Sequence, residues 1–148
     1  MEEDTMGMSR RELVAWLGFL GAAAGTIYLG WLLFLHWPGG AFDARHESVA
    51  SPIFGGFTVY ILLIAALQNW RRNEPLEDER DRAIGGVAAK HGFLALALLN
   101  VVGGVVVQSR PELVLQSGAE WIRYALLWMV LLALAVHGAS RLHGYRRG

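Results

Sequence analysis

The sequence predicts an all-α fold, an integral membrane four-helix bundle with both termini in the cytoplasm. Three observations indicate this fold: an apolar composition, four long stretches almost free of charge, and basic residues gathered at one end of those stretches. Hydrophobic residues make up 54% of the 148 residues and the mean hydropathy is +0.35, which is high for a water-soluble domain of this length. The chain is therefore predicted to be a single domain whose solvent is a lipid bilayer.

The composition excludes several classes of site and partner. Thirteen Lys and Arg residues balance thirteen Asp and Glu residues, so no excess of positive charge argues for nucleic acid as a partner. The chain contains no cysteine, which excludes disulfides, thiolate metal sites, iron–sulfur clusters and cysteine nucleophiles. No cofactor is predicted.

The first predicted span covers about residues 12–36 and carries no charge between Leu13 and Leu35. A helix of that length crosses the hydrocarbon core of a bilayer, which is roughly 30 Å thick. Arg10 and Arg11 before it would also suit a signal peptide, which is the alternative for an apolar segment near the start. The run is too long for that alternative and lacks a clear small-residue cleavage site, so a transmembrane helix is favoured.

The second and third spans are bounded by prolines. The second covers about residues 51–70 and is predicted to begin at Ser51-Pro52, with serine as the cap and proline at the first helical position. The third covers about residues 82–108 and ends before Pro111. A proline cannot continue the backbone hydrogen bonding of a helix, so it is predicted to stop the third span.

The fourth span covers about residues 118–141 and is predicted to begin at a capping box. In this motif the side chains of Ser117 and Glu120 each satisfy a backbone N–H that the first turn of a helix leaves without a partner. The segments between the spans, residues 37–48 and 109–117, are predicted to be loops.

The basic residues predict the direction of the chain, because Lys and Arg in short loops stay on the cytoplasmic side of a membrane. Only Arg45 and Arg110 flank the spans on one side, and Arg123 lies just inside the fourth span. Nine arginines flank the other side: Arg10, Arg11, Arg71, Arg72, Arg80, Arg82, Arg141, Arg146 and Arg147. Both termini and the loop before the third span are therefore predicted to be cytoplasmic, and the other two loops external.

Glycine is frequent inside the predicted spans. The sequence contains 18 glycines, and Gly21 and Gly25 form a GxxxG pattern in the first span. Small residues let helix backbones approach closely in lipid, where the burial of apolar surface gives no driving force. These two glycines, with Gly103 and Gly104 of the third span, are predicted to pack helices within one bundle or, alternatively, to form the seam of a homo-oligomer.

A run of charged residues precedes the third span: Glu77, Asp78, Glu79, Arg80, Asp81 and Arg82. The helix dipole favours acids near a helix start, so the third helix is predicted to begin near Pro75 and to extend from the membrane into the cytoplasm. The interleaved arginines would hold the carboxylates ionised and paired, whereas a general acid must hold a proton and a metal needs free oxygen lone pairs. No catalytic or metal-binding residue is predicted here. The run is either a solvated helix end or a docking surface for a protein partner.

Residues 76–84 read LEDERDRAI and are followed by Gly85 and an Ala-Ala-Lys run that ends at Lys90. This segment resembles the hallmark of a broad group of small prokaryotic membrane proteins of unknown function, in which LEDERD-x-x-I precedes the third of four spans. The resemblance implies a four-helix inner-membrane protein. It also implies an accessory or regulatory role, because members are often encoded beside short helix-turn-helix regulators, and it implies no catalytic residues. The chain departs from the group at Pro75 and at the paired Gly85 and Gly86.

Five polar residues lie within or near the ends of the predicted spans, where ionisable groups are costly and are functional candidates: Glu12, Lys90, His91, Asn100 and His137. Glu12, His91 and His137 have similar depths near the cytoplasmic side. Together they could relay protons, bind a divalent metal or hold an anionic ligand. Alternatively, Lys90 reaches the interface, each histidine hydrogen-bonds a neighbouring helix, and Asn100 clamps two helices together. No ligand spacing supports a metal, and none is predicted.

Two functions are predicted from these features. The first is a non-enzymatic accessory or regulatory subunit that docks a cytoplasmic or membrane partner through residues 74–82. The second is a small homo-oligomeric transporter or channel that uses the polar residues of the first, third and fourth helices. An intramembrane enzyme is disfavoured, because no nucleophile has a base at a recognisable spacing.

Overall fold

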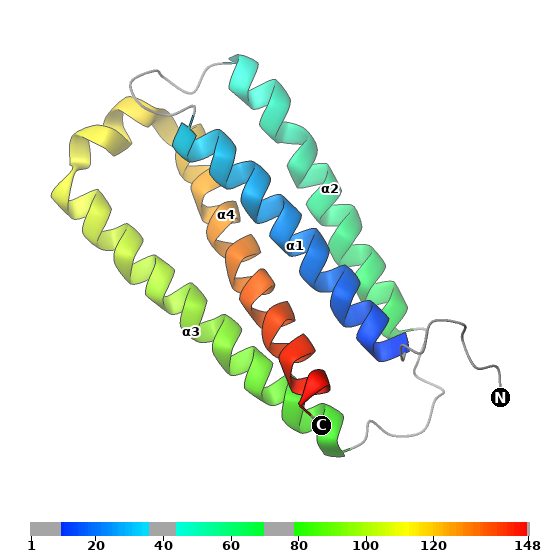
Figure 1. Ribbon diagram of the computed structural model, residues 1–148. Helices are drawn as coiled ribbons and strands as arrows, with labels where there is room; N and C mark the ends of the chain where they lie inside the picture. The colour runs from blue at the N-terminus through cyan, green and yellow to red at the C-terminus, as the bar shows by residue number, and fades with distance from the viewer. Residues whose placement is uncertain (1–9, 36–43, 70–78, 148) are drawn as a thin grey trace.

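The computed structural model of the protein describes residues 10–35, 44–69 and 79–147, and almost all of them lie in four α-helices (Figure 1). The predicted all-α fold is therefore confirmed. The helices follow one another as α1 Arg10–Leu35, α2 Ala44–Asn69, α3 Glu79–Ser109 and α4 Pro111–Arg146.

Three helices in the described part of the chain are long and apolar enough to cross a membrane, judged by length and composition. They cover Glu12–Leu35, Glu79–Ser109 and Trp121–Arg146, which correspond to the first, third and fourth predicted spans. Helix α2 is not among them, so its crossing of the membrane stays a prediction. The side of the membrane on which each terminus lies also stays a prediction.

The helices are arranged as a row in which α4 holds the central place. Helix α4 packs along both α3 and α1, whereas α2 packs against α1 through a much smaller contact. Figure 1 shows the resulting order across the molecule, with α3 at one edge, then α4 and α1, and α2 at the other edge. Helix α4 is therefore the element on which the packing of α1 and α3 depends.

The apolar core lies between α1 and α4. Leu29 and Leu33 of α1 and Tyr124 of α4 are the largest side chains that are completely buried. The core residues recur at intervals of three or four, so each set occupies one face of its helix. The core cluster consists of Leu29, Leu32, Leu33, Tyr124, Leu127 and Leu131.

Trp128 of α4 joins the two helices beside this core. Its indole N–H donates to the carbonyl oxygen of Thr26 at 3.0 Å, and its ring meets that of Phe34 edge-on with the centroids 5.1 Å apart. Gly30 makes this position possible, because a Cβ added there would lie 2.9 Å from Nε1 of the indole. An indole N–H buried in an apolar setting needs an acceptor, and the helix carbonyl supplies it.

Helix α4 also approaches both neighbours closely through glycines nearer its C-terminal end. A Cβ added to Gly138 would lie only 2.9 Å from Cα of Phe19 in α1. On the other side, a Cβ added to Gly92 of α3 would lie 3.1 Å from Cβ of His137 and 3.3 Å from the carbonyl oxygen of Ala133. Such backbone contact is what small residues provide between helices in lipid.

The four glycines singled out in the sequence have different surroundings. Gly21 lies under the ring of Tyr60 of α2, Gly25 lies against Leu131 of α4, and Gly103 lies against Met129 of α4. A Cβ added to Gly104 would meet no atom within 4 Å. The first three therefore contact other helices of the same chain, whereas Gly104 faces open space.

Tyr60 makes a polar contact between α2 and α1. Its hydroxyl donates to the carbonyl oxygen of Gly18 at 2.7 Å, and its ring lies so close to Gly21 that a Cβ there would be 2.9 Å from Cε2. Tyr60 thus joins α2 to α1 by both a hydrogen bond and ring packing.

Replacement of Tyr60 by phenylalanine keeps the ring over Gly21 and removes the hydrogen bond. We expect the free energy of unfolding to fall by about 1 kcal/mol, the usual net contribution of one such bond between membrane helices. The measurement is unfolding of the purified chain in mixed micelles with added dodecyl sulfate, followed by tryptophan fluorescence. Val59→Ala, at an exposed neighbouring position of α2, is the control. An equal loss in both variants would contradict a specific role of the hydroxyl.

The predicted start of the second helix at Ser51-Pro52 is wrong. Helix α2 begins at Ala44, and Pro52 lies inside it, so part of the predicted external loop is helical. A proline fits the first turn of a helix, which is the basis of the prediction, but it is also tolerated within membrane helices, where other groups satisfy the backbone oxygen that it leaves unbonded.

The predicted loop at residues 109–117 is also wrong, because the chain is already helical from Pro111. Proline occupies the start of α4, where its missing N–H and fixed φ suit a helix. The helix then breaks at Gly118, which has φ 74° and ψ 173°. That backbone conformation is open to glycine and strained for other residues. The break lies where the fourth span was predicted to begin, so α4 consists of a short lead-in segment and the predicted span.

Candidate functional site

The charged segment that the sequence singles out lies partly in the described residues. Glu77 and Asp78 lie outside them, as does the predicted helix start near Pro75. Helix α3 begins at Glu79 and includes the last four residues of the segment as its first turn. Glu79, Arg80 and Arg82 are exposed and Asp81 is half-buried.

The first turn of α3 presents both signs of charge to its surroundings. Glu79 and Arg80 are exposed, and no hydrogen bond or ion pair joins either of them to another described residue. Acids in the first turn are favoured by the helix dipole, which accounts for Glu79 and Asp81 at this position. The arrangement can attract a charged surface on another molecule, and it lacks the buried, shared carboxylates of a catalytic pair.

The sequence placed His91 and His137 at similar depths, and the structure gives each of them its own neighbour across the contact between α3 and α4. The ring nitrogen Nδ1 of His91 lies 2.8 Å from the hydroxyl of Ser140 in α4, at an exposed position. His137 is half-buried and its Cβ lies against Gly92. The two helices run antiparallel at a register that brings Gly92 to His137 and so His91 to Ser140, three residues further along α4.

The other polar candidates are spread over the described helices. Glu12 is half-buried in the first turn of α1, and Lys90 is exposed on α3. The side-chain amide N–H of Asn100 donates to the carbonyl oxygen of Leu96 in its own helix at 2.9 Å, and the residue is exposed. The structure therefore brings the five candidates to no common centre. In the part of the chain that the structure describes, no group of three or more His, Cys, Asp or Glu residues is placed to hold a metal ion.

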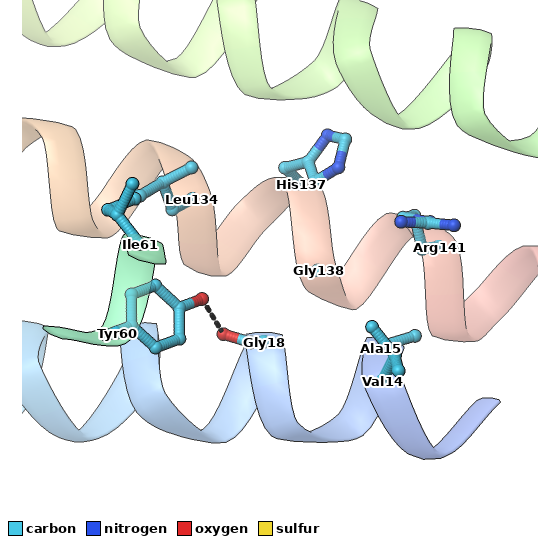
Figure 2. A pocket seen from close by; sticks show the side chains of 9 residues that line it. All are labelled: Val14, Ala15, Gly18, Tyr60, Ile61, Leu134, His137, Gly138 and Arg141. Carbon is cyan, nitrogen blue, oxygen red and sulfur yellow. Dashed lines mark hydrogen bonds between the residues drawn. The ribbon is translucent and has the colours of Figure 1, made fainter. Parts of the chain in front are cut away.

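A cavity of about 170 Å³ lies between α1, α2 and α4 (Figure 2). Of the five polar candidates it includes only His137. It also includes Arg141, one helical turn further along α4, and Tyr60 of α2. Figure 2 shows Tyr60 reaching across to Gly18 while His137 and Arg141 project from successive turns of α4. The lining residues are Val14, Ala15, Gly18, Tyr60, Ile61, Leu134, His137, Gly138 and Arg141.

A second cavity, of about 230 Å³, lies between α3 and α4 and is almost wholly apolar. It shares Leu134 and His137 with the first cavity, so His137 borders both spaces. Its other lining residues include Gly92, Phe93 and Leu96 of α3. This cavity lacks the arginine and the hydroxyl group of the first.

Arg141 is the residue that sequence reasoning missed. It entered that reasoning only as one of nine flanking arginines that orient the chain. In the structure it is half-buried, its Nη2 donates to the hydroxyl of Tyr145 at 3.2 Å, and its guanidinium lies 6.0 Å from the centre of the Tyr145 ring. Its Nε is buried and has no hydrogen-bond acceptor among the described residues. The spacing of His137 and Arg141, one turn apart on α4, is the sequence signal that points to this pair.

Comparison with known proteins adds no further residue to these candidates. The chain matches no protein-family model, no curated protein and no solved structure. The resemblance carried by residues 76–84 therefore stays a prediction, and a function has to be argued from the geometry of the chain itself.

Proposed function

We propose that the protein is a non-enzymatic accessory or regulatory subunit of the prokaryotic cytoplasmic membrane, inserted with both termini inside. In this proposal it docks a partner membrane protein through residues 74–82 and through the exposed side of α3 that continues from them. The observation that carries the proposal is the exposure of α3, a helix with an exposed charged first turn and a largely uncovered apolar length.

Helix α3 has 31 residues, of which only Ala88 and Gly92 are buried. Helix α4 is the one described helix with which α3 makes a substantial contact. Large apolar side chains are exposed along its length, including Phe93, Leu98 and Val105. Lipid can cover such a surface, and so can a helix of another membrane protein. The charged first turn of α3 and the amide of Asn100 favour a protein helix over lipid.

One stripe of α3, which we name the open α3 face, consists of Phe93, Ala97, Asn100 and Gly104. These residues recur every three or four positions and all are exposed. The amide nitrogen of Asn100 bonds within its own helix, and no hydrogen bond to the amide oxygen is described. An amide in the apolar part of a span gains about 1–2 kcal/mol from a donor on a neighbouring helix. Gly104, one turn away, leaves room for that helix to come close.

The transporter or channel alternative has less support. Transport through the chain requires polar groups that converge on a path, and the five polar candidates do not converge. Of these five residues, His137 alone lines the two cavities described above. This alternative would require a homo-oligomer in which the copies contact one another through the open α3 face. Asn100 of each copy would then lie near the centre.

The experiment that tests the proposal is cross-linking in native membranes followed by affinity purification of the tagged chain and mass spectrometry. Because the chain contains no cysteine, a single cysteine at exposed Ala97 provides a site-specific cross-link from the open α3 face. We expect a second membrane protein in stoichiometric amount. Recovery of the chain alone, as a discrete oligomer, would contradict the accessory function and favour the homo-oligomeric alternative.

Charge reversal in the first turn of α3 tests the docking segment itself. We expect Arg80→Glu to reduce recovery of the partner at least about tenfold, because a like charge now faces the partner where an opposite charge did. Insertion and abundance should stay unchanged, since Arg80 is exposed and contacts no other described residue through hydrogen bonds or ion pairs. Arg147→Glu, at an exposed position on the end of α4, is the control. An equal loss in both variants would show a general effect of charge rather than docking at α3.

A further inference from the structure

The cavity between α1, α2 and α4 contains a cation, Arg141, for which the described residues provide no anionic partner. An arginine guanidinium is charged at all physiological pH values, and all five of its N–H groups are donors. In Arg141 the described contacts are those to Tyr145, and the buried Nε has no acceptor. None of the nine lining residues is acidic. Glu12 lies one turn before Ala15 on α1 but does not line the cavity. A buried donor on a charged group without an acceptor is costly, so an external acceptor would be stabilising.

We propose that this cavity binds the phosphate group of an anionic phospholipid, with Arg141 and His137 as hydrogen-bond donors. A guanidinium presents two parallel N–H groups that match two oxygens of a phosphate. Histidine supplies a ring N–H whether it is neutral or charged. Both residues project from one side of α4 and line the same cavity (Figure 2).

The size and the other walls of the cavity favour a lipid phosphate. A volume of about 170 Å³ is close to the roughly 150 Å³ of a cavity that holds one benzene molecule, so it admits a headgroup phosphate but not a whole phospholipid. The remaining walls are mainly aliphatic, with Val14, Ile61 and Leu134. Such walls can pack against the glycerol and first acyl carbons of a lipid. They do not stabilise a free ion, which would have to lose its hydration to contact them.

The position of the cavity along the helices is also that of a lipid headgroup. It lies near the C-terminal end of α4, where Arg146 and Arg147 are exposed. The guanidinium of Arg146 lies 5.4 Å from the ring centre of Trp16 in α1. Tryptophan and arginine are typical of the membrane interface, and basic pockets between membrane helices at that level bind anionic headgroups.

The test is a lipid titration of the full-length chain. The protein is purified, depleted of lipid in a neutral detergent, and titrated with phosphatidylglycerol, phosphatidylcholine or inorganic phosphate while its Tm is measured. We expect phosphatidylglycerol to raise the Tm of the unmodified protein and the other two to raise it much less. Arg141→Gln should weaken the apparent affinity for phosphatidylglycerol about tenfold, which corresponds to about 1.4 kcal/mol, and Arg141→Lys should weaken it less.

The control is Arg147→Gln, which removes the same charge from the same end of α4 at a residue that does not line the cavity. We expect it to keep the affinity of the unmodified protein. Equal weakening by Arg141→Gln and Arg147→Gln would overturn the proposal in favour of general attraction to a charged helix end. A Tm rise with inorganic phosphate equal to that with phosphatidylglycerol would identify the ligand as a soluble anion instead of a lipid.

Two further outcomes are decisive. If Arg141→Gln does not fold, His137→Gln provides the second donor variant, and unchanged affinity in it would overturn the proposal. No Tm rise of the unmodified protein with phosphatidylglycerol would do the same. The Tm of each variant before lipid is added separates a loss of folding from a loss of binding.

Discussion

Gly138→Leu is expected to separate α1 from α4 and to lower the free energy of unfolding by more than about 3 kcal/mol, beyond the usual range for overpacking. A Cβ at this position would lie 2.9 Å from Cα and 3.3 Å from the backbone nitrogen of Phe19. Backbone atoms of a helix cannot turn aside as the end of a flexible side chain can, so the whole of α1 must move away from α4.

Gly138→Ala is expected to have a smaller effect in the same direction. The added methyl group collides with the same backbone, but alanine favours the helix over glycine by about 1 kcal/mol, which offsets part of the loss. Because α2 packs mainly against α1, displacement of α1 removes α2 from α4 as well. The variants thus disrupt the contact between α1 and α4, which is one of the two large helix contacts.

The measurement for both variants is unfolding in mixed micelles with dodecyl sulfate, followed by tryptophan fluorescence. Gly104→Leu is the matched control, since a Cβ at Gly104 meets no atom within 4 Å. We expect that control to be at least as stable as the unmodified protein. A Gly138→Leu variant with undiminished stability would contradict the close approach of α1 and α4 at Phe19.

The sequence predicts the number of helices better than their arrangement, and the reason lies in the signals that each leaves. Residues 13–35 form an uncharged run, and a helix of that length matches the thickness of a bilayer's hydrocarbon core. Helix α1 could therefore be predicted from composition alone. The placement of α4 between α3 and α1 depends on which faces of these helices pack together. The sequence contains no comparable signal for that choice. Gly138 is where α4 comes close to the backbone of Phe19 in α1. In the sequence, nothing distinguishes it from the other glycines of the predicted spans.

The helix ends show the same contrast. Pro111 was predicted to stop the third span, and α3 does end before it, at Ser109. Pro52 was predicted to start a helix and lies within one instead. The same residue type is compatible with both positions, because other groups can satisfy the one backbone oxygen that an internal proline leaves unbonded. Proline alone therefore does not decide whether a helix begins, ends or continues at its position.

The candidate sites were predicted in part. The charged run before the third span is plain in the sequence, whereas the cavity beside Arg141 needs residues from three helices that are far apart in the chain. His137 was a candidate because an ionisable group inside a span is conspicuous. Arg141 was not, because an arginine at a span end has an ordinary role as a topology signal. The burial of its Nε without an acceptor is a property of the packed helices and has no signal in the sequence.

Gly104→Leu is expected to leave the fold intact and to reduce recovery of the partner at least about tenfold. The adjacent glycines of α3 have opposite surroundings: Gly103 lies against Met129 of α4, whereas Gly104 faces away into open space. A leucine at Gly104 thus meets no atom of this chain, but it would hold a partner helix away from the open α3 face and from Asn100. Loss of a close helix contact in lipid removes packing that nothing else replaces.

The measurement is the same cross-linking and purification from native membranes, with recovery of the partner normalised to the amount of tagged chain. Gly55→Leu is the matched control on α2, because that glycine is also exposed with no atom within 4 Å of an added Cβ. Loss of the partner in Gly104→Leu but not in Gly55→Leu would place the contact on α3. Undiminished recovery in Gly104→Leu together with loss in Arg80→Glu would mean that only the first turn of α3 docks the partner. The apolar length of α3 would then face lipid, and the amide of Asn100 would be held by its own helix alone.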